Sequence, residues 1–193
     1  MAERKARADA LRNRETVLAA ADELFARSAS PRTVSMDEIA AAAGVGKGTL
    51  FRRFGDRTGL IRAVFEARIE PLRTAVTDGP APLGPATPPR ERVPALLDAL
   101  LRFKLDNRHL SLALEEAGSG SPYQAGHYTW WHGTLRDALR RLPGHEDADF
   151  TAHALLAATR ADLVEHLAGE EGTAPARIRA QLAAFVGRVL GQG

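Results

Sequence analysis

The stretch Ser35–Arg57, SMDEIAAAAGVGKGTLFRRFGDR, constrains the fold of this chain more than any other part of it. Ser35 suits a helix N-cap and Glu38 follows three positions later, so the pair predicts a capping box. Gly44 suits the left-handed position that often ends a helix. A second helix is expected over about Lys47–Phe54. Two helices joined by so short a turn predict a helix-turn-helix.

The second helix of this stretch is basic. The helix contains Lys47, Arg52 and Arg53, and Arg57 follows shortly after it. The one acidic residue among these is Asp56. Gly48 and Thr49 are small, so the backbone can approach a groove wall. A helix-turn-helix with a basic second helix favours DNA binding in the major groove. The alternative is a helical hairpin with a solvated basic face.

Residues 34–65, VSMDEIAAAAGVGKGTLFRRFGDRTGLIRAVF, resemble the DNA-binding domain of TetR/AcrR-family transcriptional regulators. The resemblance rests on the AAGV turn, the helix KGTLFxxF and the segment DRxxLIxAVF after it. It covers about the first seventy residues. The rest of the chain matches the family only in length and helical character.

The resemblance implies a set of DNA contacts. Lys47, Gly48 and Thr49 are expected to read base edges, whereas Thr49 and the three arginines are expected to meet mostly phosphates. Phe51 stands where the family commonly has tyrosine, so one hydroxyl contact to phosphate is missing. The full set of expected DNA-binding residues is Arg32, Thr33, Ser35, Lys47, Gly48, Thr49, Phe51, Arg52, Arg53 and Arg57.

The whole chain reads as all-α. We expect a helix-turn-helix DNA-binding domain over residues 1–56, completed by a helix from about Ala8, with residues 1–7 a basic tail or a DNA-contacting arm. A connecting helix follows over residues 57–77, in which Pro71 favours a stop or kink near Glu70. Residues 78–89 hold five prolines and predict a linker or loop. Residues 90–193 are expected to form a helical regulatory and dimerisation domain.

Two broad apolar helices close the chain, over about Asp147–Ala168 and Pro175–Leu190. Their faces are wider than a single amphipathic stripe, so each helix is either central to the monomer core or covered by a second copy. Sequence alone leaves both readings open. The family resemblance implies a homodimer, and a two-fold dimer matches a palindromic operator.

Both tryptophans and both tyrosines of the chain lie in the segment YQAGHYTWWH. Such a cluster packs a core or lines an apolar cavity with a few polar groups. The resemblance implies a cavity for a small-molecule effector. The expected lining residues are Phe103, Tyr123, His127, Trp130, Trp131, His153 and Arg160.

The sequence offers little for catalysis. Asp149 and His153 are spaced i, i+4, as are Asp162 and His166, but nothing in the sequence supplies an obvious third metal ligand. There is no glycine-rich phosphate loop after a strand, no nucleophile elbow and no HExxH motif. We therefore expect no enzyme, no metal site and no cofactor.

Composition agrees with a cytoplasmic protein without a membrane partner. The chain is 45% hydrophobic and 26% charged, with no cysteine and no apolar run long enough to span a bilayer. Its net charge of +2 hides a basic first half and an acidic middle of the second half, which suits DNA contact at one end only.

These observations predict a ligand-responsive regulator of transcription. We expect a repressor that leaves its double-stranded operator when a small molecule binds the C-terminal domain. Two alternatives remain. One is a DNA-binding dimer controlled by a protein partner, and the other is a metal-dependent helical sensor or enzyme that uses the histidine–aspartate pairs.

Overall fold

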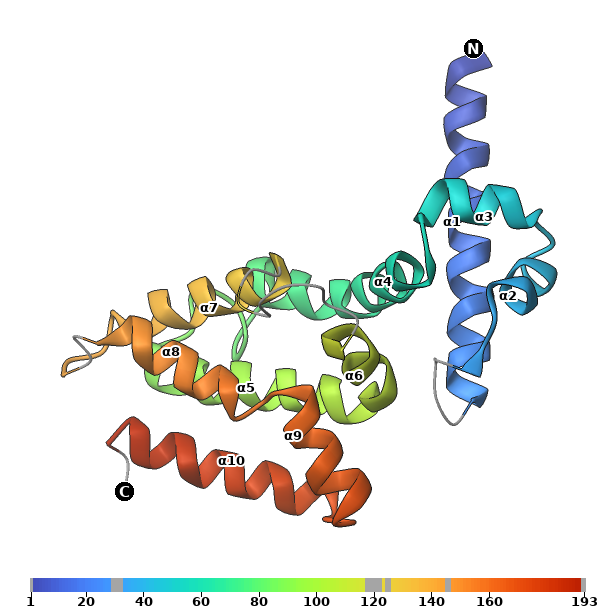
Figure 1. The fold of residues 1–193 in the computed structure, drawn as a ribbon. Coiled ribbons are helices and arrows are strands. Elements are labelled where there is room, and N and C mark those ends of the chain that lie inside the picture. Colours follow the sequence, from blue (N-terminus) through green and yellow to red (C-terminus); the bar gives the residue numbers. More distant parts are fainter. Residues whose placement is uncertain (1, 29–32, 117–122, 124–125, 145–146, 192–193) are drawn as a thin grey trace. The chain divides into compact units, whose positions relative to one another are not determined.

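The computed structural model describes residues 2–28, 33–116, 123, 126–144 and 147–191, with side chains from residue 12 onward. Every regular element in these residues is a helix, which confirms the all-α prediction. The chain divides into two compact units, Met1–Arg68 and Ile69–Gly193 (Figure 1). None of the described helices is both long and apolar enough to cross a bilayer.

The first unit is a helix-turn-helix packed on a long helix (Figure 1). It contains α1 (Ala2–Arg27), α2 (Met36–Ala42), α3 (Lys47–Phe54) and the start of α4 (Arg57–Asp78). The prediction that α1 begins near Ala8 was wrong, since helix extends back to Ala2. The segment AERKARADALRNR is rich in alanine, arginine and other strong helix formers, which explains the longer helix.

Local signals in the sequence fix both ends of α2. The Ser35 hydroxyl accepts the backbone N–H of Glu38 at 3.1 Å, and the Ser35 N–H donates to the Glu38 carboxylate at 2.7 Å. This confirms the predicted capping box. Gly44 has a φ of 63°, the left-handed conformation that favours glycine, so the chain turns there into α3.

Helix α4 begins directly after Asp56, a residue type that suits an N-cap, and then passes through Pro71 without ending. The Asp56 carboxylate accepts the Gly59 N–H at 2.8 Å. Of the stop or kink predicted near Glu70, the stop was wrong, because α4 runs on to Asp78 with Pro71 inside it. Burial of Ile69 and Val76 on either side of the proline holds the helix against the second unit's core and offsets the missing backbone hydrogen bond.

In the residues that the structure describes, the second unit contains the end of α4 and six further α-helices. Figure 1 shows how they pack. They are α5 (Pro89–Asp106), α6 (Arg108–Glu116), α7 (Gly126–Leu139), α8 (Ala148–Ala157), α9 (Ala161–Glu165) and α10 (Pro175–Val189). Helix α7 packs on α8 and on α5, while α10 lies against α5. The Arg179 guanidinium binds both oxygens of Asp98, at 2.7 and 3.0 Å, and this lowers the pKa of Asp98.

The predicted single helix over Asp147–Ala168 was wrong. It is two helices, and α9 runs into a π-helical turn, His166–Glu170. The buried hydroxyl of Thr159 donates to the Leu156 carbonyl at 2.9 Å, which competes with helix continuation. Ser121, which suits an N-cap because Pro122 follows it, lies outside the described residues, and α7 itself begins at Gly126.

The proline-rich segment between α4 and α5 forms turns that are held in place by a buried side chain of α5. Arg92 of α5 is only 9% exposed, and its guanidinium donates to the Val76 carbonyl and to the Leu83 carbonyl, both at 2.9 Å. One buried side chain therefore joins the end of α4, the loop and α5.

Replacing Arg92 with methionine is expected to lower the free energy of unfolding by about 2–4 kcal/mol, because two carbonyls lose a charged donor. Arg102→Met is the matched control. Arg102 pairs with Asp98 at the surface, with its side chain 57% exposed, so its loss should cost less than about 1 kcal/mol. Urea unfolding of both variants measures the difference, and equal losses would contradict the fastening role of Arg92.

Candidate functional site

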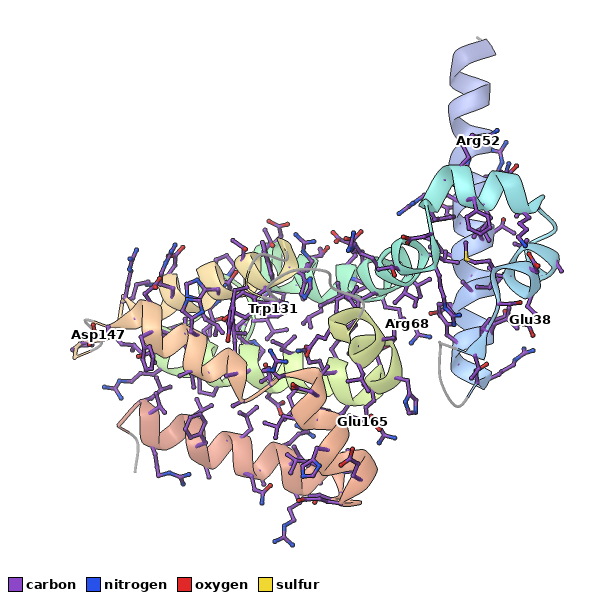
Figure 2. All side chains as sticks on the ribbon, viewed as in Figure 1. Glu38, Arg52, Arg68, Trp131, Asp147 and Glu165 are labelled. Carbon is purple, nitrogen blue, oxygen red and sulfur yellow. The ribbon has the colours of Figure 1, made fainter. Side chains whose placement is uncertain are left out.

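Helix α3 has one buried face and one exposed face. Leu50 and Phe54 are buried and hold α3 against the rest of the first unit. Lys47, Gly48 and Arg52 lie on the exposed side (Figure 2 labels Arg52). The exposed face is therefore small and basic at its beginning and basic again at its end.

The other predicted DNA-binding residues lie around this face in different degrees of exposure. Phe51 is 39% exposed, a large apolar side chain on the outside of the helix. Thr49, Arg53 and Arg57 are half-buried, whereas Thr33 and Ser35 are exposed just before α2. Arg32 lies outside the described residues.

An ion pair across the turn orients the first residue of α3. The Lys47 ammonium lies 2.7 Å from the Asp37 carboxylate of α2, and both side chains are more than half exposed. Exposed pairs of this kind are weak, so Lys47 is able to exchange Asp37 for another anion. No local pattern in the sequence indicates this contact, because Asp37 lies ten positions earlier in the chain.

Two further contacts constrain the surroundings of α3. The Arg14 guanidinium of α1 lies 5.5 Å from the centre of the Phe54 ring, which places another cation beside the end of α3. Hydrogen bonds from the Ser35 backbone and hydroxyl lower the pKa of Glu38, so the carboxylate stays charged at the start of α2. Both polar groups of Ser35 are thus engaged in capping.

In the second unit, four rings from the predicted pocket region form an aromatic–histidine cluster: Tyr123, Tyr128, His132 and His153. Tyr123 packs edge-on against both Tyr128 and His153, at 5.1 and 5.9 Å between ring centres. The His132 and His153 rings stack at 3.9 Å, which brings α7 against α8. Only Tyr123 and His153 were among the expected pocket residues.

The tryptophans form a separate pair on α7. Their rings are perpendicular with centres 4.9 Å apart. Trp131 is 3% exposed and belongs to the core, as Figure 2 shows by its position inside the second unit. Trp130 is half-buried, and the Arg73 guanidinium of α4 lies 5.0 Å from its ring centre. The end of α4 therefore contacts the predicted pocket region directly.

The remaining predicted pocket residues are more scattered. Phe103 and His127 are half-buried on α5 and α7. Arg160 lies between α8 and α9, where its guanidinium binds Asp162 at 2.7 Å and approaches Glu115 at 3.8 Å. These hydrogen bonds and charges raise the pKa of Arg160.

A hollow of about 240 Å³ lies between α1 and α4 of the first unit, and none of the expected pocket residues lines it. Its walls are Leu18, Ala19, Asp22, Val64, Ala67 and Arg68.

The two aspartate–histidine pairs at i, i+4 spacing differ in their contacts. His166 pairs with Glu170 at 2.7 Å rather than with Asp162, which binds Arg160 instead. Asp149 and His153 do face each other at 3.9 Å, and His132 supplies a third group 3.6 Å from Asp149. The sequence analysis expected no third group near this pair.

The first unit is similar in sequence to a known family of proteins. Residues 17–64, from the middle of α1 into α4, match the model of the bacterial regulatory proteins of the tetR family. The HTH-type transcriptional regulator SAB2452 of Staphylococcus aureus (strain bovine RF122 / ET3-1) is 34% identical over 124 residues, 63% of this chain and 64% of that protein. The regulator SAR0097 of S. aureus (strain MRSA252) is 29% identical over 119 residues, 62% of each chain.

The match confirms the resemblance of the DNA-binding region to the TetR family.

Solved structures extend the likeness in fold to the second unit. A TetR-like transcriptional regulator from Rhodococcus sp. RHA1 matches with a TM-score of 0.61 at 22% identity, covering 94% of this chain and 97% of that one. A gamma-butyrolactone receptor (ArpA-like protein) matches with a TM-score of 0.54 at 24% identity, covering 95% and 100%. The chain spans less than two thirds of the length of the S. aureus relatives that it matches in sequence.

In the second unit, Tyr128 and His132 were not among the predicted site residues. Both lie on α7 with i, i+4 spacing, which places them on one face of a helix. The rings stack at 6.2 Å between centres. That spacing was a usable signal, whereas their contact with His153 depends on how α7 and α8 pack.

Proposed function

We propose that this chain regulates transcription by inserting α3 into the major groove of an operator. The observation that carries the proposal is the two-sided character of α3. Leu50 and Phe54 are buried against the rest of the first unit, so Lys47, Gly48 and Arg52 face outward, together with the exposed Phe51. The resemblance to the TetR family supports the same function.

The proposed division of labour follows the position of each residue on α3. Lys47, Gly48 and Thr49 stand in the first turn, which is the part of a recognition helix that reaches base edges. Arg52 and Arg53 stand in the last turn, where they are suited to phosphates. Phe51 packs against sugar and backbone but has no hydroxyl to donate.

Replacing Lys47 with alanine is expected to relax base preference, because a donor to base edges is lost. Replacing Arg53 with alanine should weaken binding to all sequences alike and reduce the salt slope by about one phosphate contact. Binding titrations against operator and scrambled duplexes over a range of salt separate the two effects. Arg62→Ala, an exposed arginine of α4, is the control. Equal loss of sequence preference in the Lys47→Ala and Arg53→Ala variants would refute the proposal that Lys47 reads bases and Arg53 binds phosphate.

The proposal includes a homodimer held by α8, α9 and α10. In the single chain Phe150 is 73% exposed and Leu163 is 38% exposed, which is unusual for large apolar side chains. Phe185 of α10 is half-buried. A second copy would cover these side chains, and its two-fold symmetry would match a palindromic operator.

Replacing Leu163 with glutamate is therefore expected to convert the dimer into a folded monomer. Because Leu163 is partly exposed in one chain, the charge is tolerated there, but it would be unpaired and buried in the dimer. Sedimentation velocity gives the mass, and circular dichroism checks the fold. Thr77→Glu adds a charge at an exposed position of α4, outside the proposed interface, and should leave the dimer intact. A monomeric unmodified protein at micromolar concentration would contradict the proposal.

We further propose that a small molecule bound among Phe103, Tyr123 and Trp130 causes release from the operator, which makes the protein a repressor. Helix α4 offers the route. It begins directly after α3, continues unbroken to Asp78, and carries Arg73 against Trp130. A gamma-butyrolactone receptor among the structural neighbours supports a small-molecule effector for this fold.

The effector would act by changing geometry. Two recognition helices of a dimer must lie one DNA turn apart, about 34–36 Å, so a modest tilt of each α4 would spoil the fit. An effector produces this tilt only to the extent that it prefers the tilted form. Effector and operator must then weaken each other's binding by the same factor.

A reciprocal titration tests this coupling. Tryptophan fluorescence should report binding of an effector found by screening, because both tryptophans lie in the proposed region. With saturating operator, the apparent affinity for the effector should fall by the factor with which saturating effector weakens operator binding. A scrambled duplex is the control. An effector affinity that is unchanged by operator would exclude this mechanism.

A further inference from the structure

Three side chains of the types that commonly bind metal ions lie close together where α7 packs on α8. We call His132 of α7 and Asp149 and His153 of α8 the His–Asp–His cluster. One possible ligand atom from each residue lies within 4.8 Å of those from the other two. The Nε2 atom of His132 lies 3.6 Å from one carboxylate oxygen of Asp149, and the Nε2 atom of His153 lies 3.9 Å from the other.

We propose that the His–Asp–His cluster binds a divalent transition-metal ion of the Zn²⁺ type. Two imidazole nitrogens and one carboxylate oxygen suit Zn²⁺ and its neighbours, whereas Mg²⁺ and Ca²⁺ prefer oxygen ligands. Three protein ligands leave the fourth position of a tetrahedral ion to water. The Asp149 side chain is 62% exposed, so water has access, while the His132 side chain is only 12% exposed.

A contact behind His153 supports this assignment. The Tyr128 hydroxyl lies 2.6 Å from Nδ1 of His153. When Nδ1–H donates to the tyrosine oxygen, the lone pair of His153 is placed on Nε2, the atom that faces Asp149. Outer partners of this kind fix the tautomer and the ring orientation of histidine ligands.

Two features must change when the ion binds. The Nε2–H of His132 donates to the Asp149 carbonyl at 3.1 Å, so this ring has to move its proton to Nδ1. The Arg136 guanidinium lies 3.9 Å from the Asp149 carboxylate, and it also binds Asp137 at 3.1 Å. The ion would take the place of Arg136 beside Asp149, and Asp137 would keep the displaced charge paired.

The alternative occupant of the cluster is a proton. In that case Asp149, Arg136 and the two histidines form only a network of ion pairs and hydrogen bonds. The two readings differ in what the cluster binds, so a metal titration decides between them.

Isothermal titration of the untagged full-length protein with ZnCl2, with MgCl2 as comparison, is the direct test. We expect saturable Zn²⁺ binding with about one ion per chain and no Mg²⁺ binding at the same concentrations. His132→Gln, His153→Gln and Asp149→Asn should each weaken Zn²⁺ binding by at least about 10-fold. Tyr128→Phe should weaken it by about 10- to 100-fold, because an outer partner of a ligand is lost.

The matched control is His166→Gln. His166 is another histidine four positions from an aspartate, but it pairs with Glu170, so its loss should leave Zn²⁺ affinity unchanged. Substituted Co²⁺ gives an independent readout, since its visible absorption should change in the Asp149→Asn variant. Asp149 is largely exposed, so this variant is expected to keep its fold, which circular dichroism checks.

Absence of saturable Zn²⁺ binding would overturn the proposal, as would binding that the cluster variants leave intact. The titration needs no operator and no organic effector. Its result is therefore separate from the proposed regulation of DNA binding, which stands or falls on the duplex titrations.

Discussion

The burial of Leu50 and Phe54 is the contact on which the proposed DNA interface depends. A helix of eight residues has too few turns to be stable alone in water, so α3 exists because its apolar face is covered. Once those two side chains are fixed inward, the rotation of the helix is fixed as well. Lys47 and Arg52 then have to face outward. The packing of Leu50 and Phe54 in the core therefore also determines which face of α3 is available to DNA.

The second unit is held together by a different kind of contact. The Lys104 side chain of α5 is only 14% exposed and binds Glu115 of α6 at 3.0 Å. The same carboxylate accepts the Ala161 N–H at the start of α9. Burial lowers the pKa of Lys104, and the charge of Glu115 opposes that effect. Three helices therefore meet at one carboxylate. Removal of Glu115 would leave the mostly buried charge of Lys104 without its carboxylate partner, which is costly.

The features predicted correctly were those coded by near neighbours in the chain. The Ser35–Glu38 capping box, the turn at Gly44 and the bounds of α3 each depend on a few consecutive residues. Such features can be predicted from the sequence because helix capping and φ preferences depend on neighbouring residues. The helical class of the second unit was legible for the same reason, through the apolar periodicity of its segments.

The features missed were those decided by packing between distant segments. Pro71 does not end α4, because burial around it outweighs a lost hydrogen bond. The break at Thr159 needs a buried hydroxyl that cannot reach water. The Lys47–Asp37 pair and the meeting of His132 with Asp149 join different helices. For the metal-ligating groups, the sequence showed two residues at helical spacing, and only the packing of α7 on α8 added the third.

The grip of Arg92 on the segment between α4 and α5 has a consequence for how the chain tolerates change in length. Loops that are merely tethers accept extra residues at little cost, since closure entropy grows slowly with length. This one does not qualify as a tether. Its carbonyl at Leu83 is bound by a buried guanidinium, and Thr87 is 2% exposed. An insertion between these two residues would therefore disturb a buried hydrogen bond rather than lengthen a spacer, despite a composition that suggests the opposite.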